Sequence, residues 1–139
     1  MTPLTLHNYE YAIDVANEEI DEQGRVNNAV YLKWVQVAVV HQWKRLAPKD
    51  AIASHLWVAL KHEIRYLHPA FLNDHVEIQV LLEKLHGARA YFKTLIERNG
   101  EVLAVAESCW CCLDAATQRP VRLARDVMEK FLPTKITPS

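Results

Sequence analysis

The stretch from Glu18 to Gln36, EEIDEQGRVNNAVYLKWVQ, decides how this chain is organised. Its first half is polar and contains Gly24, one of only three glycines in the sequence. Its second half opens a run from Ala29 to Leu46 that has no proline or glycine and is mostly apolar. Such a run is typical of a buried helix, because it is too long and too poorly alternating for a strand. Asn27 and Asn28 are good N-cap residues, so the sequence predicts a polar loop leading into the N-terminus of a buried helix.

The start of this helix is a favourable place for negative charge. The first N–H groups of a helix lack intrahelical acceptors, and the helix dipole puts positive charge at the same end. The segment from Ala29 to Leu46 contains no Asp or Glu. A catalytic carboxylate on the helix itself is therefore excluded, and the candidates lie before it.

Asp21 is the preferred candidate carboxylate, in a loop that Gly24 allows to turn. A carboxylate there can act as a general base on water or as a nucleophile on a carbonyl. It can also have a purely structural role, as a loop or cap residue. The alternative carboxylates are Asp14, Glu18, Glu19 and Glu22. Asp14 is expected in the middle of a strand, and Glu18 and Glu19 are expected to be solvated.

Length and charge narrow the function classes. The chain has 139 residues, half of them hydrophobic, and most simply forms one domain over residues 1–139. Its 16 basic and 17 acidic residues give a net charge of −1, which offers no electrostatic case for binding nucleic acid or a membrane surface. The N-terminal stretch lacks the basic head and apolar core of a signal peptide, and no apolar run has the length of a membrane span.

The three cysteines, Cys109, Cys111 and Cys112, lie within four residues. Their odd number and clustering argue against a disulfide framework and fit a reducing cytoplasm. Cys109 and Cys112 have the spacing of a metal or redox pair, but residues three apart in a strand point to opposite faces. We therefore expect core cysteines and no metal site.

Alternating hydrophobicity predicts five strands, at residues 9–15, 57–66, 75–85, 89–98 and 101–113. In the second strand, Val58, Leu60, His62, Ile64 and Tyr66 are expected on one face; in the third, Val76, Ile78, Val80 and Leu82 are expected to point inward. Asn99-Gly100 predicts a tight hairpin, residues 48–54 a connector, and residues 124–132 a short helix. The result is an α+β domain, a curved antiparallel sheet packed on one long helix. The helix is apolar over more than one face, which predicts a partner subunit.

Two motifs resemble those of the hot-dog fold acyl thioesterases, of the 4-hydroxybenzoyl-CoA and acyl-carrier-protein thioesterase types. The stretch from Asp21 to Leu32, DEQGRVNNAVYL, is similar to the family pattern D-x-x-G-H-V-N-N-x-x-Y-L. The stretch from Glu63 to Asp74, EIRYLHPAFLND, is similar to E-x-x-Y-L-x-P-A-x-x-G-D. The chain departs from these patterns at Arg25 and Asn73, and Gln36 stands where many members carry Glu.

The resemblance implies a five-stranded hot-dog domain that forms a homodimer, or a tetramer, with active sites between subunits. It implies hydrolysis of a thioester of coenzyme A or acyl-carrier protein without metal or organic cofactor. The catalytic carboxylate falls on Asp21, and the backbone N–H that polarises the carbonyl falls near Asn28 and Ala29.

The substrate-binding candidates are Asn27, Tyr31, Arg25 and Arg89. Each also has a simpler explanation: Asn27 as helix cap, Tyr31 in the core, Arg25 and Arg89 in solvent. Arg25 at a pocket mouth would select an acidic acyl group, and Arg89 would contact coenzyme A phosphates. Two other functions stay open. One is a non-catalytic module that binds acyl thioesters; the other, weaker because no His follows Asp21 before His41, is a hydratase or dehydratase.

Overall fold

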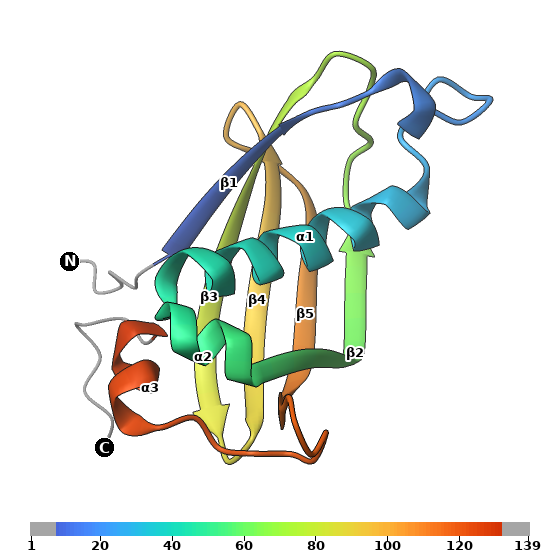
Figure 1. Cartoon of the computed structure of the whole chain (residues 1–139). Helices are drawn as coiled ribbons and strands as arrows, with labels where there is room; N and C mark the ends of the chain where they lie inside the picture. The colour runs from blue at the N-terminus through green and yellow to red at the C-terminus, as the bar shows by residue number, and fades with distance from the viewer. Residues whose placement is uncertain (1–7, 132–139) are drawn as a thin grey trace.

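The computed structural model describes residues 8–131. Its five strands are antiparallel and lie in the order β1-β3-β4-β5-β2. Their bounds are β1 (Asn8–Asp14), β2 (His55–Tyr66), β3 (His75–His86), β4 (Arg89–Arg98) and β5 (Glu101–Asp114). The long helix α1 (Asn28–Leu46) lies across one face of this sheet (Figure 1). The predicted sheet and central helix are both confirmed.

The core forms between α1 and the inner face of the sheet. Trp34, Val35 and Ala38 of α1 are almost fully buried. The four β3 side chains predicted to point inward are all buried: Val76, Ile78, Val80 and Leu82. Burial of this apolar face stabilises α1 despite the poor helix propensity of its many valines.

Two asparagines make the tight turns that the fold needs. Asn99 and Gly100 have φ values of 52° and 82°, as the predicted hairpin requires. Asn73 has a φ of 71°, and it stands where the hot-dog pattern has glycine. Asparagine tolerates this left-handed conformation better than most residues, so the turn survives the substitution.

The predicted face of β2 is wrong in its first half. The pairing of β2 with β5 shifts register between Ala59 and Lys61, which marks a β-bulge. Before the bulge Trp57 and Ala59 pack on the core, while Leu56, Val58 and Leu60 are 44%, 43% and 50% exposed. One extra residue inverts the alternation, and a periodic pattern in the sequence does not reveal it. The edge strand β2 therefore presents an apolar strip to solvent.

The segment predicted as a connector contains a helix, so that prediction is also wrong. Helix α2 (Lys49–Ser54) starts directly after Pro48. Ala51 is buried and Ile52 packs against the core, so tertiary contacts stabilise a helix too short to be predicted from propensity.

A third helix, α3 (Arg125–Phe131), and a short 3₁₀ turn, η1 (Asn17–Glu19), complete the described elements. The predicted terminal helix is thus confirmed except at its two ends. Ala124 precedes the helix, and Leu132 lies outside the described residues, as do residues 1–7. Within residues 8–131 no helix is both long and apolar enough to cross a membrane.

Candidate active site at the start of helix α1

A polar pocket of about 520 Å³ opens where α1 begins and β2 ends. The loop before α1 forms one side, and the end of β2 with the following turn forms the other. Its lining residues are Asp21, Gln23, Arg25, Val26, Asn27, Asn28, Tyr31, Tyr66, Leu67, His68 and Pro69. The fold thus brings together five of the seven predicted site residues; Ala29 and Arg89 are not among them.

The N-cap of α1 determines which backbone N–H groups face the pocket. Asn27 Oδ1 accepts a hydrogen bond from the Ala29 N–H at 2.9 Å, and the Asn27 carbonyl accepts one from the Val30 N–H at 2.9 Å. The Ala29 N–H is therefore already used by the cap. The Asn28 N–H donates to no other group within residues 8–131. Of the two predicted donors, Asn28 is the one that remains available to a ligand.

Asp21 shapes the loop and still presents a carboxylate to the pocket. Its Oδ1 accepts the backbone N–H groups of Gln23 at 2.8 Å and Arg25 at 3.1 Å. Its carbonyl accepts the Gly24 N–H at 3.1 Å, and Gly24 has a φ of 83°. No hydrogen bond of Oδ2 is found in the described part of the chain. One carboxylate oxygen thus holds the loop, and the other is available.

Glu19 is not solvated, contrary to the prediction. Its Oε1 accepts the Ala16 N–H at 2.9 Å, and its Oε2 accepts the indole N–H of Trp34 at 3.3 Å. Its backbone carbonyl accepts the Asn27 N–H at 3.0 Å. Because Trp34 is buried in α1, Glu19 ties the loop that carries Asp21 to the central helix. Sequence reasoning missed this role, since nothing local marks a contact between residues fifteen positions apart.

Two tyrosines form the apolar side of the pocket. Tyr31 is only 2% exposed, its hydroxyl accepts the Ala70 N–H at 3.0 Å, and burial raises its pKa above the ordinary value. Its ring lies edge-on to that of Tyr66, with centroids 5.3 Å apart. Tyr66 donates from its hydroxyl to the Asn28 carbonyl at 3.3 Å. Tyr66 was not predicted as a site residue, although it is the tyrosine of the second motif.

The two predicted arginines lie in different places. Arg25 is exposed at the pocket. Arg89 begins β4, whereas Arg98 ends it and donates to the Pro69 carbonyl beside the pocket at 3.1 Å. The strand between them spans about 30 Å at ~3.3 Å per residue. Arg89 therefore does not reach the pocket of its own chain.

His62 and the cysteines lie outside this pocket. His62 Nδ1 is 2.8 Å from Ser108 Oγ, its Nε2 is buried without a partner in the described part, and burial lowers its pKa. His62 is therefore mostly neutral at pH 7. Cys112 is buried, and its burial raises the thiol pKa to about 12, so it carries almost no thiolate at neutral pH.

Comparison with known proteins points to one family. Residues 15–131 match the model of the thioesterase-like superfamily. The chain is 30% identical over 126 residues to the long-chain acyl-CoA thioesterase FadM of Escherichia coli K12, covering 86% of this chain and 93% of that protein. It is also similar to a thioesterase from Thermus thermophilus solved with coenzyme A and zinc, with 27% identity, a TM-score of 0.76, and coverage of 87% and 89% of the two chains. A hypothetical protein from Aquifex aeolicus shares the fold, with a TM-score of 0.79 at 22% identity, covering 88% of this chain and 98% of that one.

The Glu19 contacts predict a measurable loss of stability. Replacing Glu19 by Gln turns one acceptor oxygen into a donor that faces an N–H group. We expect Glu19→Gln to lower the free energy of unfolding by about 1–3 kcal/mol in urea titrations. Glu18→Gln, at an exposed neighbouring position, is the matched control and should change little.

A Trp34→Phe background separates this contact from a general charge effect. Trp34→Phe removes the indole N–H. In this background Glu19→Gln should therefore lower the free energy of unfolding by less than it does in the wild type. An equal loss in both backgrounds would show that the hydrogen bond from Trp34 to Glu19 contributes nothing to stability.

Proposed function

Because the chain belongs to the thioesterase-like superfamily, we propose that it hydrolyses acyl-CoA thioesters to a carboxylic acid and free coenzyme A. One observation carries the proposal: the free Asn28 N–H at the start of α1 and the Asp21 carboxylate line the same pocket. Thioester hydrolysis needs these two groups, one to polarise the carbonyl and one to supply or activate an oxygen nucleophile. The similarity to a long-chain acyl-CoA thioesterase and to a thioesterase solved with coenzyme A supports the substrate class.

The Asn28 N–H is proposed to hold the thioester carbonyl oxygen. This N–H sits at the positive end of the α1 dipole, where the charge that develops on the oxygen is stabilised most. Asn27 supports this geometry by capping the helix, because its side chain fixes the first turn. The Tyr66 hydroxyl, bonded to the Asn28 carbonyl, braces the same residue from the other side of the pocket.

Asp21 is proposed to act on the other side of the carbonyl. As a general base it takes a proton from water while the water oxygen attacks the carbonyl carbon, and the C–S bond breaks as the tetrahedral intermediate collapses. The thiolate that leaves then receives the proton. As a nucleophile, Asp21 would instead attack the carbonyl carbon and displace the thiolate, which forms an anhydride. Water would then open the anhydride, releasing the carboxylic acid and restoring the Asp21 carboxylate. The Asp21 Oδ2, which has no partner in the described residues, is the oxygen available for either route.

The remaining site residues are proposed to bind substrate. Tyr31 forms the pocket wall against the acyl group, and Arg25 at the mouth favours an acidic or polar substituent. An acyl-carrier-protein thioester is the alternative substrate. A non-catalytic module that binds acyl thioesters is the alternative function, and release of free thiol from a panel of acyl-CoAs distinguishes it from an enzyme. A cytoplasmic location and a single domain over residues 1–139 stay predictions.

We also propose that two copies pair through their β2 edges. β2 is the last strand of the sheet, so a second copy can pair with its outer edge, and the exposed Leu56, Val58 and Leu60 of two paired strands would then lie side by side in one apolar strip. A two-fold axis would run the two β2 strands antiparallel. The Arg89 end of one sheet would then lie beside the Tyr66 end of the other, which is how Arg89 would reach coenzyme A phosphates in the partner's site.

Substituting Asp21 tests the catalytic assignment. Asp21→Asn keeps an Oδ1 acceptor for the loop but removes the charge, so we expect kcat for thiol release to fall at least ~100-fold. Circular dichroism and light scattering should show an unchanged fold and assembly. Glu22→Gln, at an exposed neighbouring position, is the control and should keep wild-type kcat. Near-wild-type turnover of Asp21→Asn would rule out this carboxylate while leaving the enzyme class open.

Light scattering tests the proposed dimer. At micromolar concentration we expect the wild type to have at least twice the mass of one chain, and Val58→Lys to be monomeric because an edge lysine blocks strand pairing. Val37→Lys is the control, since Val37 on α1 is similarly exposed, at 37% against 43% for Val58. A wild-type monomer that still hydrolyses thioesters would contradict the proposal.

A further inference from the structure

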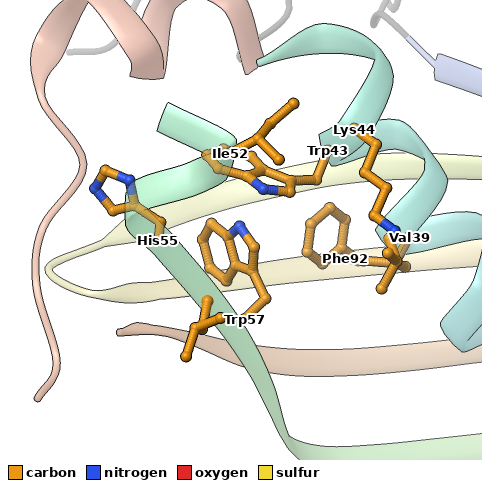
Figure 2. Close-up of a pocket in the computed structure, with 9 residues that line it drawn as sticks. Val39, Trp43, Lys44, Ile52, His55, Trp57 and Phe92 are labelled. Atoms are coloured by element: carbon orange, nitrogen blue, oxygen red, sulfur yellow. The ribbon is translucent and has the colours of Figure 1, made fainter. Parts of the chain in front are cut away.

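A second pocket lies toward the other end of α1 and shares no lining residue with the pocket at Asp21. It has a volume of about 220 Å³ and is mostly apolar. Figure 2 shows Trp43 of α1, Trp57 of β2 and Phe92 of β4 turned toward one another around it. Val39, Val40 and Ile52 add aliphatic surface. We call it the aromatic pocket.

The same two elements border both pockets. The pocket at Asp21 includes Asn28 and Tyr31 of α1 and Tyr66 of β2. The aromatic pocket includes the stretch of α1 around Trp43 and the start of β2 at Trp57. Between them, the β2 residues on the inner side are only half-buried, namely Ala59, His62 and Ile64. A ligand chain that starts at the Asn28 N–H and follows α1 and β2 would pass these half-buried residues before it meets the aromatic pocket.

The distance between the two pockets determines how long an acyl chain must be to reach from one to the other. Residues 28 and 43 are 15 positions apart in α1, which is ~22 Å at ~1.5 Å per residue. A fully extended chain advances ~1.2 Å per bond, given ~3.3–3.6 Å for the three backbone bonds of a residue. Val39, the first α1 residue of the aromatic pocket, is 11 positions from Asn28, or ~16 Å. About 14 carbons thus reach the near end of the aromatic pocket and about 18 reach Trp43, whereas a chain of about eight carbons ends well before it.

From this geometry we propose that the aromatic pocket holds the terminal carbons of a long acyl chain whose thioester lies at Asn28 and Asp21. The proposal rests on the proposed thioesterase function and adds the class of acyl group. The volume has room for roughly seven groups of water size, each ~30 Å³, which suits the last methylenes of a C16 to C18 chain. The polar residues at the pocket, Lys44 and His55, form no catalytic arrangement; the His55 ring is 2.9 Å from the Ala51 carbonyl.

Filling the pocket tests the proposal by kinetics. Ile52→Phe adds bulk to the lining, while Val37→Phe, on the exposed face of α1 and outside this pocket, is the matched control. We compare kcat/KM for palmitoyl-CoA with kcat/KM for octanoyl-CoA. Each methylene displaced to water changes the ratio by about fourfold. We expect the palmitoyl to octanoyl ratio to fall at least ~10-fold in Ile52→Phe and to stay at the wild-type value in Val37→Phe. An unchanged ratio in Ile52→Phe, with its fold intact by circular dichroism, would overturn the proposal.

A binding measurement keeps the result independent of catalysis. 16-Bromohexadecanoic acid carries a quenching bromine at its far end, so it should quench tryptophan fluorescence of the wild type. The Trp43→Phe/Trp57→Phe double variant should lose most of this quenching, and 8-bromooctanoic acid should quench these two tryptophans far less. Equal quenching in wild type and double variant would reject the aromatic pocket as the acyl site. Absence of any thiol release together with the expected quenching would reject the proposed catalysis and leave the pocket assignment standing.

Discussion

The side-chain cap of α1 is the interaction on which the candidate site depends. Asn27 Oδ1 takes the Ala29 N–H, so the first turn of the helix is fixed while the Asn28 N–H stays free. A free N–H at a capped helix end carries partial positive charge, and it is effective when an oxygen with developing negative charge arrives. The cap thereby gives one short segment both its structural and its proposed catalytic role.

The rest of the fold holds this helix end in place. Glu19 binds the buried Trp34 with its side chain and Asn27 with its carbonyl, so the loop, the cap and the core form one connected unit. Asp21 closes the loop on itself with one carboxylate oxygen. On the opposite side, Tyr31 and Tyr66 pack together and link the helix to the end of β2. The sheet thus positions the groups of the site without contributing a charged side chain to its centre.

Sequence reasoning predicted what periodicity and local motifs encode. The long apolar run, the inward residues of β3 and the Asn99-Gly100 hairpin follow from side-chain alternation and backbone preference, and all three are confirmed. The failures have a common cause in tertiary structure. The β2 bulge, helix α2 and the Glu19–Trp34 bond depend on contacts between distant residues, and no local pattern reports them. That Asp21, Asn27 and Asn28 lie close together was predictable, because they are near one another in the sequence. Tyr66 is distant in the sequence, and only the folded sheet brings it to the same pocket.

An NMR titration tests most directly whether the Asn28 N–H receives the thioester carbonyl. The ligand is an octanoyl-CoA analogue in which a methylene replaces the sulfur, so the carbonyl is kept and hydrolysis is blocked. At saturation the amide proton of Asn28 should move to higher frequency, while that of Ala29, already bonded to Asn27, stays nearly constant. An Asn28 amide that does not move while other residues of the pocket respond to the ligand would contradict the central claim.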